Sequence, residues 1–516
     1  MKKNKILSLF LALMMICAVL PGCGDGSGSG TEGSNGLQAE RKANNEIVAA
    51  IAEDLKSLDP HSSTTAGTRE VLFNIYEGLF KTGPDGELIP AVAEKYTTSA
   101  DGLTYTFTLR DGVRFHNGNA VTAEDVIYSI KRCADNEGSA IDSSLVSAFS
   151  VISDVQATDD KTVVLTLKQP DLELLNFLTA AIVPANYDKL DTEPCGTGPF
   201  KFSSRSVKEN FVIEKFDEYW GTPASLSKVT FQVYDDSTAL VNALQSGAVD
   251  LCSKLTSAQT AQLSDSYTIL EGTMNLVQAV YLNNNAAPFD NEKVRQAISY
   301  AINRQQILDM VADGHGAAVG SSIYPKLAKY FLPELVNYYE YNPEKAKQLL
   351  ADAGYPNGEG FPTIEYSTND AGYHTPVAEY VQQAWGELGI TVNINKVEWA
   401  SFLPMRRAGD YDVSRNGWVM DYNDPSNMLE LFTTNNGNND GKYANPEFDA
   451  AIDASKVADK SVHFQKLHEA EDILMKDAAA IPVAYYTDFW LQSPSLKGTW
   501  HSPYGYWYLQ YGYIEE

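Results

Sequence analysis

The sequence is poor in cysteine and in positive charge. Its 516 residues contain 5 cysteines, and 39 lysines and arginines stand against 67 aspartates and glutamates. The formal net charge of −28 argues against nucleic acids and anionic surfaces as partners. After the N-terminal segment only Cys133, Cys195 and Cys252 remain, and their spacing fits no metal site. At most one disulfide can form among them, and three buried free thiols are an equal alternative.

The familiar catalytic motifs are also absent. The chain contains no Gly-x-Ser-x-Gly, no His-Glu-x-x-His and no Gly-x-x-x-x-Gly-Lys-Ser/Thr sequence. The glycines of 314-GHGAAVG-320 have the wrong spacing for a phosphate loop, so we interpret them as a helix C-cap and turn. The closest histidines, His463 and His468, do not fall on one helical face. We therefore predict a receptor without enzyme activity, metal or cofactor.

Long apolar runs are missing except at the N-terminus. Three lysines precede an apolar run at residues 6–20, and after residue 22 no apolar run is long enough to cross a bilayer. A basic start followed by a short apolar segment is typical of a secretory signal, since the run is too short for a spanning helix. We expect a signal peptide at residues 1–22 and an extracytoplasmic protein.

The end of that signal resembles the bacterial lipobox. The sequence 20-LPGC-23 implies that the thiol of Cys23 is acylated and becomes the first residue, although Pro21 replaces the usual small residue. The alternative is a plain signal peptide with an incidental cysteine. Residues 23–45 are rich in glycine and serine at their start, which predicts a flexible linker. A lipid anchor on the outer face of the plasma membrane follows, or a periplasmic location in a cell with two membranes.

The length of the chain indicates more than one domain, because a single core stops growing at about 250–300 residues. Helical and strand periods alternate without strict order, which predicts a mixed α/β class. Asp-Gly and Asn-Gly turns predict a hairpin at 103–118, and an amphipathic pattern predicts one long helix at 290–311. Further helices are expected at 69–80 and 376–389, at 121–133 with Thr122 and Asp125 as an approximate capping box, and at 342–355 with Asn342 as its cap. Strands are expected at 162–170, 211–220 and 390–399.

Several segments, in order along the chain, resemble the large, peptide-class (family 5) solute-binding proteins of ABC importers. They are 57-SLDPH-61, 76-YEGLF-80, 112-GVRFHNGNAVTAEDVIYSIKR-132, 196-GTGPF-200, 288-PFDNEKVRQAISYAINR-304 and 342-NPEKAKQLLADAGY-355. The resemblance covers almost all of the chain after the linker. It implies a three-domain, periplasmic-binding-protein-like α/β fold of type II, with two lobes, a hinge, a small inserted domain and a cleft that closes on the ligand.

Approximate domain boundaries follow from this resemblance. Lobe I would comprise residues 46–76, 191–275 and 489–516, the inserted domain 77–190, and lobe II 276–488. Two strands that cross near Leu276 and Asp488 would form the hinge.

The resemblance also predicts how a peptide N-terminus is bound. The run 415-RNGWVMDYNDPSNML-429 is similar to the oligopeptide- and dipeptide-binding branches, in which the residue at Asp421 pairs with the ligand's α-ammonium. A buried cation is tolerable only when it is paired and hydrogen-bonded. The alternative is that Asp421 merely begins a turn before Asp424 and Pro425.

Other candidate residues would hold the rest of a peptide. Arg406, Arg415 and His374 resemble family residues that reach the ligand's carboxylate, and a guanidinium binds a carboxylate bidentately. Arg407 adjoins Arg406, so either of the two arginines could match the family position. For Arg406, Arg415 and His374 alike, the alternative is a solvated or structural role without ligand contact.

The peptide main chain needs a slot of its own. Trp418, Tyr422 and Asn423 are candidates to line it, with core or turn roles as the alternative. A glutamate that some oligopeptide binders carry after the Leu-Asp-Pro turn is replaced here by serine and threonine at 62–65, which leaves room for a different side-chain preference.

These observations favour a monomeric lipoprotein that captures peptides and delivers them to an ABC permease. An oligosaccharide or another non-peptide solute is the alternative within the same fold, because 7 tryptophans and 29 tyrosines are available to stack on apolar faces. A surface-anchored hydrolase is the alternative from another class, and it lacks any nucleophile–base signature.

Overall fold

The structure of the protein is a computed structural model. It describes residues 38–515 apart from 64, 85, 135–140, 254, 274–275, 321–331, 370–373, 420–423, 501 and 503. The predicted signal peptide and Cys23 therefore lie outside the described residues. No helix among the described residues combines the length and the apolar character needed to span a membrane.

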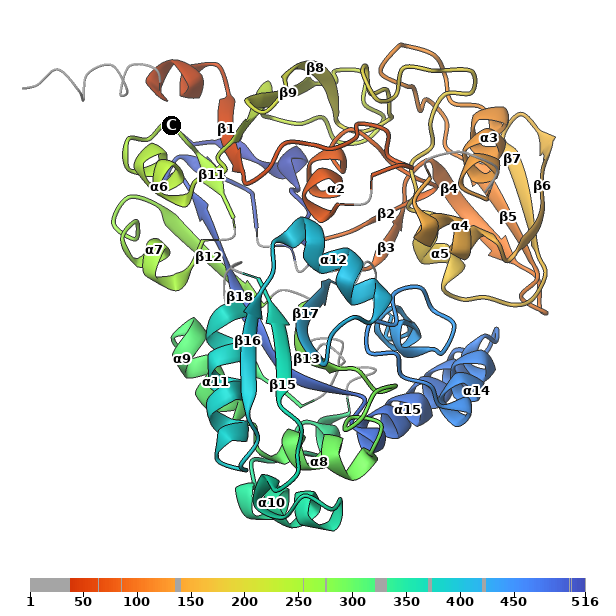
Figure 1. The fold of residues 1–516 in the computed structure, drawn as a ribbon. Helices are drawn as coiled ribbons and strands as arrows, with labels where there is room; N and C mark the ends of the chain where they lie inside the picture. Colours follow the sequence, from red (N-terminus) through yellow and green to blue (C-terminus); the bar gives the residue numbers. More distant parts are fainter. Residues whose placement is uncertain are drawn as a thin grey trace, which may run out of the picture.

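The larger clusters of buried hydrophobic residues in the described chain lie in three regions, namely lobe I, the inserted domain and lobe II. Figure 1 shows the helices and strands of these regions. The core of lobe I contains Phe211, Phe231 and Trp490. The core of the inserted domain, hereafter the insert, lies between Leu79 and Cys195. Two adjoining clusters between Val277 and Tyr486 form the core of lobe II. The domain boundaries at residue level stay a prediction.

In the described part of the chain, a sheet of 12 strands runs through both lobes in the order β16-β15-β17-β13-β18-β11-β1-β10-β9-β8, and β12 and β14 also pair with β18. Its strands are β1 (Glu46–Ile51), β8 (Phe200–Ser206), β9 (Asn210–Lys215), β10 (Lys228–Val233), β11 (Leu251–Cys252), β12 (Thr268–Thr273), β13 (Leu276–Leu282), β14 (Gly316–Ala318), β15 (Ile364–Thr368), β16 (Val392–Lys396), β17 (Val413–Val419) and β18 (Ala480–Gln492). Its parallel and antiparallel pairs agree with the predicted mixed α/β class.

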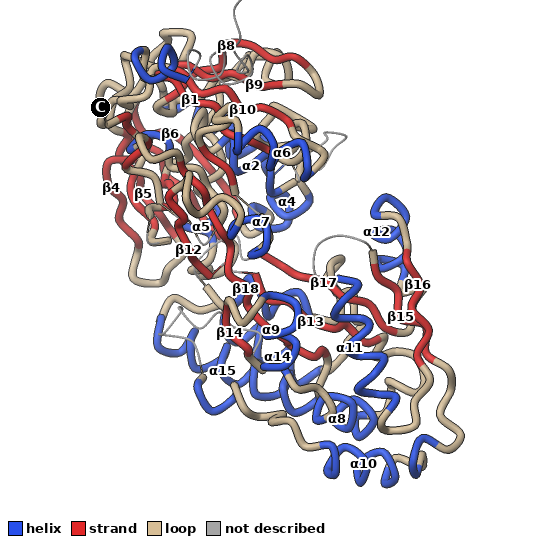
Figure 2. The backbone as a smooth tube through the Cα atoms, turned by 90° about the vertical axis from the view of Figure 1, so that its left-hand side faces the viewer, coloured by secondary structure: helices blue, strands red, loops and turns tan. Residues whose placement is uncertain are grey.

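The long strand β18 joins the lobes. Its first half pairs with β13 and β14, and its second half pairs with β12 and β11. Figure 2 shows β18 running from the upper part of the molecule, with lobe I and the insert, into lobe II below. Within this ladder Asp488 lies opposite Gly272. The predicted crossing positions near Leu276 and Asp488 thus lie in strands that connect the two halves.

The insert is built on an antiparallel sheet in the order β4-β5-β7-β6. Its elements are β2 (Phe80–Thr82), β3 (Leu88–Pro90), β4 (Ala93–Thr98), β5 (Thr104–Leu109), α3 (Ala123–Ala134), α4 (Ser143–Phe149), β6 (Ile152–Asp159), β7 (Thr162–Leu167) and α5 (Leu174–Phe177). The predicted start of α3 is confirmed, because Thr122 and Asp125 exchange hydrogen bonds as a capping box does.

The predicted hairpin at 103–118 is wrong in its pairing. Strand β5 pairs with β4 on one side and with β7 on the other, so neither edge is free for residues 113–116. Those residues form only an isolated bridge between Arg114 and Ala120, closed by the Asn117–Gly118 turn. The helix predicted at 69–80 is also too long, because α2 covers Ala66–Leu72 and the chain then enters β2.

Helices cover the sheet of lobe II. They are α8 (Glu292–Tyr300), α9 (Arg304–Ala312), α10 (Pro343–Asp352), α11 (His374–Gly386), α12 (Trp399–Ala408), α13 (Ser426–Leu429), α14 (Pro446–Ser455) and α15 (Lys460–Asp477). The single helix predicted at 290–311 is two helices, because the side chain of Asn303 accepts a hydrogen bond from the amide of Gln306 and begins α9. The predicted helix at 342–355 begins at its Asn342 cap as expected.

The remaining elements are short. They are α6 (Ser237–Gln245), α7 (Ser257–Ala261), β19 (Leu496–Lys497), β20 (Tyr513–Ile514) and the 3-10 helices η1 (Pro333–Leu335), η2 (Pro356–Gly358), η3 (Glu430–Phe432) and η4 (Leu509–Tyr511). Cys133, Cys195 and Cys252 are buried free thiols, which decides between the two alternatives for the cysteines.

Candidate functional site

Those residues predicted to bind a ligand that the structure describes lie on three elements of lobe II. Strand β17, between β13 and β15, carries Arg415 opposite Val280 and places the backbone of Trp418 opposite Val277. The side chain of Trp418 is not described. Asp421, Tyr422 and Asn423 lie outside the described residues, so their roles stay predictions.

Arg415 is deeply buried and short of hydrogen-bond partners. Arg415 is 1% exposed. Neither Nη1 nor Nη2 of its guanidinium has a hydrogen-bond partner among the described residues. The guanidinium carbon lies 6.0 Å from the ring centroid of Tyr486 on β18. The hydroxyl of Tyr366 on β15 is also buried without a hydrogen-bond partner among the described residues. Buried polar atoms of this kind have a large desolvation cost unless a ligand satisfies them.

Arg406 lies on α12 and is only partly satisfied. Its Nη2 forms an ion pair with Asp440, while Nε and Nη1 have no hydrogen-bond partner among the described residues. The neighbouring Arg407 is exposed. Of the two neighbouring arginines it is therefore Arg406 that faces the interior, and its role in ligand binding stays a prediction.

His374, the first residue of α11, lies near both arginines. Burial, and then the charges of Arg415 and Arg406, lower the pKa of His374 to about 3. The imidazole is therefore neutral at physiological pH, and its buried Nδ1 has no hydrogen-bond partner among the described residues. The three residues predicted separately thus form one group.

The charges of the described residues of this group do not balance. Arg406 and Arg415 supply two positive charges, His374 is neutral, and Asp440 supplies one negative charge. A buried guanidinium without a counter-ion is strongly unfavourable, so an anion that enters this group is favoured. A carboxylate fits best, because two parallel N–H donors of one guanidinium can bind both of its oxygens.

A cavity of about 160 Å³ lies at the junction of lobe I and the insert. Pro60 and Ser63, which belong to the Leu-Asp-Pro turn and its serine and threonine extension, line it together with Asn176 and Phe177 of the insert. The rings of Phe73 and Tyr506 stack at a centroid distance of 4.5 Å in its wall. The different side-chain preference expected from the serine and threonine residues of this turn stays a prediction.

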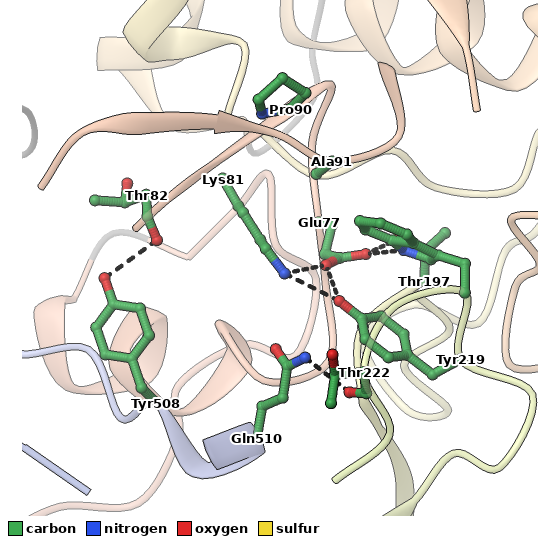
Figure 3. Close-up of polar contacts among 12 residues, drawn as sticks. Glu77, Lys81, Thr82, Pro90, Ala91, Thr197, Tyr219, Thr222, Tyr508 and Gln510 are labelled. Carbon is green, nitrogen blue, oxygen red and sulfur yellow. Dashed lines mark hydrogen bonds and ion pairs between the residues drawn. The ribbon is translucent and has the colours of Figure 1, made fainter. Parts of the chain in front are cut away.

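The wall of this cavity contains a buried glutamate with several donors (Figure 3). The Glu77 carboxylate accepts hydrogen bonds from Lys81 Nζ at 3.1 Å and from the Tyr219 hydroxyl at 2.7 Å. It also accepts from Trp220 Nε1 at 2.7 Å and from Thr197 Oγ1 at 3.3 Å. These contacts join the insert to lobe I in one satisfied network.

Sequence reasoning missed several residues of the site and its surroundings. Tyr366 and Asp440 carry no local motif, and only the fold brings them to Arg415 and Arg406. A second group was also missed. Glu173, Asp424 and His463 each offer one atom suited to a metal, and these atoms lie within 4.8 Å of one another. Their separation along the chain gives no metal-type spacing.

Comparison with known proteins agrees with the fold and the predicted family. Residues 87–440 match the family described as "Bacterial extracellular solute-binding proteins, family 5 Middle". The chain is 31% identical over 539 residues to heme-binding protein A of Haemophilus influenzae, covering 96% of this chain and 97% of that protein. It is 30% identical to the oligopeptide-binding protein OppA of Bacillus subtilis, covering 95% of this chain and 96% of the relative.

Solved structures share the architecture. DppA of Helicobacter pylori, in complex with the peptide STSA, has a TM-score of 0.80 and 27% identity, and the match covers 93% of this chain and 100% of that chain. OppA of Haemophilus influenzae, in complex with RPPGFSPFR, has a TM-score of 0.77 and 26% identity, over 92% of this chain and 99% of that chain. The predictions of this fold and of a binding protein rather than an enzyme are confirmed: the chain belongs to family 5 of the bacterial extracellular solute-binding proteins.

Proposed function

We propose that the protein captures extracellular peptides between its lobes and delivers them to a membrane permease of the ABC class. The observation that carries this proposal is the buried group of Arg406, Arg415 and His374. Counted over the described residues it holds one positive charge in excess, and the terminal nitrogens of Arg415 lack hydrogen-bond partners within the same part of the chain. A ligand carboxylate satisfies both requirements.

Relatives support a peptide over an oligosaccharide. The curated relatives include an oligopeptide-binding and a dipeptide-binding protein of Bacillus subtilis, each 30% identical to this chain. A neutral sugar would leave the excess charge of the arginine group without a partner. Heme-binding protein A is similarly close at 31% identity, so overall similarity alone does not identify the ligand. The charge of the arginine group is what favours a peptide.

The second half of the proposal concerns the peptide's N-terminus. Asp421 follows β17 and would pair with the α-ammonium, so that the two ends of the ligand meet opposite charges. Loss of that pairing leaves an unpaired buried ammonium, which costs about 3–5 kcal/mol or roughly two to three decades in Kd. Asp421→Asn keeps the shape of the side chain, which makes it the matched test of charge alone.

Calorimetric titration tests both ends. The protein is titrated with a peptide pool in three forms, free, N-acetylated and C-amidated. We expect acetylation and amidation each to weaken binding strongly. Arg415→Met should abolish the penalty of amidation, and Asp421→Asn should abolish the penalty of acetylation. Equal binding of all three forms would contradict the peptide proposal and direct the search to other solutes.

Capture requires closure of the cleft. We propose a domain division with lobe I at 46–76, 191–275 and 489–516, the insert at 77–190 and lobe II at 276–488. The paired strands β12, β13 and β18 connect the two halves and would bend on closure. Small-angle scattering with and without peptide should show a smaller radius of gyration in the complex.

A lipid anchor would keep the receptor beside its permease. We propose acylation of Cys23 after removal of residues 1–22, with residues 23–45 as a tether. The protein should partition into detergent when it is made in bacteria, and Cys23→Ser should move it to the aqueous phase. Unchanged partitioning of the variant would contradict the anchor and leave peptide binding unaffected.

A further inference from the structure

The insert touches lobe II as well as lobe I. The turn that contains Gly102 lies against Ala458 in the loop between α14 and α15, since a Cβ on Gly102 would be 2.8 Å from the Ala458 Cβ. Close by, the N-cap residue of α5, Glu173, meets residues of lobe II.

Three side chains from the two domains converge at this junction. Glu173 of the insert and Asp424 of lobe II are each 8% exposed, and His463 of α15 is 1% exposed. Their carboxylate oxygens and imidazole nitrogen lie within 4.8 Å of one another. Two oxygens and one imidazole nitrogen are a donor set that suits Zn²⁺ and related divalent cations.

The orientation of His463 is set from outside the group. Its Nδ1 lies 2.7 Å from the carbonyl oxygen of Ser455, so Nδ1 carries a proton and donates it. Nε2 is thereby directed to Asp424, with Oδ2 at 3.1 Å. Metal-ligating histidines are held in the same way, with one ring nitrogen donating to a carbonyl and the other facing the ion.

Asp424 is also held in place. Its Oδ1 accepts hydrogen bonds from the amide of Ser426 at 3.0 Å and from the Ser426 hydroxyl at 2.8 Å. These bonds leave Oδ2 facing His463. The two lobe II donors are therefore preorganised, and the insert supplies the third.

Further carboxyl groups lie around the three donors. Asp171 and Glu430 lie near Glu173 and Asp424, and Lys456 forms an ion pair with Glu430 at 3.2 Å. Four carboxyl groups thus lie together with two basic side chains, Lys456 and His463, and a divalent cation between the domains would lower the repulsion among the carboxylates.

We propose that Glu173, Asp424 and His463 bind a divalent cation of the Zn²⁺ type that ties the insert to lobe II. Mg²⁺ and Ca²⁺ fit less well, because they prefer six or more oxygen ligands. A tetrahedral ion would keep a fourth position for water or for a neighbouring carboxylate. The cation would stabilise the contact between the insert and lobe II, and it would do so whatever solute the cleft takes.

Calorimetry on the full chain, freed of metal with a chelator and dialysed, tests the site with ZnCl₂ as the probe. We expect one site in the unaltered chain, and at least tenfold weaker binding in Glu173→Gln and in His463→Gln. The matched control is His315→Gln, because His315 also faces a carboxylate, that of Glu271 at 3.6 Å, but has no third donor among the described residues. The control should bind Zn²⁺ as the unaltered chain does.

Thermal unfolding in chelator checks that the variants fold, and added ZnCl₂ should raise the Tm of the unaltered chain and of His315→Gln only. No Zn²⁺ binding by the unaltered chain would overturn the proposal and would indicate that a proton offsets the excess charge. Binding that survives unchanged in both Glu173→Gln and His463→Gln would overturn it too. Peptide binding is measured separately, so failure of one proposal does not decide the other.

Discussion

Two buried glutamates of the insert, Glu77 and Glu173, have opposite surroundings. Glu77, at the junction with lobe I, accepts hydrogen bonds from four side chains, one of them the ammonium of Lys81 (Figure 3). Glu173, at the junction with lobe II, lies among further carboxyl groups. The same residue type thus meets a network of donors at one junction and a group of further carboxyl side chains at the other.

The difference separates a fixed junction from one that depends on conditions. A buried carboxylate with satisfied oxygens and a paired cation is held rigidly, and removing it leaves its donors unpaired. A carboxylate among like charges contributes little until a cation or a proton joins it. We therefore expect the insert to move with lobe I during closure, and its contact with lobe II to respond to the solution.

The largest effect is expected at the first junction. Glu77→Gln removes the charged partner of the Lys81 ammonium and turns an amide NH₂ toward other donors. The free energy of unfolding should fall by about 3–5 kcal/mol. Urea unfolding followed by fluorescence measures it. A loss below about 1 kcal/mol would show that this junction is not held by Glu77.

Acid should weaken the same junction through His61. The ring is buried and neutral, because Nε2 donates to the Ala181 carbonyl at 2.8 Å and Nδ1 accepts from Arg132 at 2.7 Å. Burial, and then the charge of Arg132, lower the pKa of His61 from 6.5 to about 4. Its contribution to stability is therefore complete above pH 6.5 and is lost as the pH falls toward 4.

Each pH unit in that window should cost about 1.4 kcal/mol through this one group. Unfolding measured from about pH 7 to about pH 4.5 should show a slope that is smaller by one proton in His61→Gln. The exposed His315 provides the control, and His315→Gln should keep the slope of the unaltered chain. Equal slopes in all three proteins would contradict the assignment to His61.

A smaller effect is expected from steric change at the second junction. Gly102 has a φ of +71°, and a Cβ there would lie 2.8 Å from the Ala458 Cβ. Gly112, also in the insert, has a φ of +76°, and a Cβ added there would meet no atom within 4 Å. Both alanine variants should lose about 1–2 kcal/mol from the positive φ alone.

Only Gly102→Ala should, in addition, reduce the affinity for Zn²⁺ and the protection of the loop between α14 and α15 from hydrogen exchange. If the two variants show the same loss of stability, the same affinity for Zn²⁺ and the same protection from hydrogen exchange, the contact of the insert with lobe II adds nothing to stability.

The smallest effect is expected from Glu173→Gln in the presence of a chelator. The substitution keeps the shape and removes one of several like charges, so the free energy of unfolding should be unchanged or higher by up to about 1 kcal/mol. The sign is opposite to that of Glu77→Gln. A loss of several kcal/mol would mean that the two junctions are alike.

Elements with local signals were predicted well from the sequence, and those that depend on neighbours were not. The capping pairs at Thr122 and Asn342 gave the starts of α3 and α10, because a cap involves only a few adjacent residues. The hairpin at 103–118 failed because its Gly turns were real but β5 found its partners elsewhere. The helix at 290–311 failed because Asn303 acts as a cap.

The candidate site divides in the same way. Resemblance identified Arg406, Arg415 and His374 one at a time. Only the structure shows that they form one group, that Asp440 neutralises one guanidinium, and that His374 is uncharged. The metal-type group has no signature in the sequence. Its three donors are far apart along the chain, and Glu173 comes from another domain than Asp424 and His463.

The order of residues was sufficient for the α/β class, the absence of catalytic motifs and the family, since each depends on local patterns or on motifs that survive in sequence. Charge balance was decided by tertiary structure alone. Whether a buried carboxylate meets an ammonium, as Glu77 does, or other carboxylates, as Glu173 does, depends on which distant segments pack together. Burial then makes that difference large, because water no longer screens the charges.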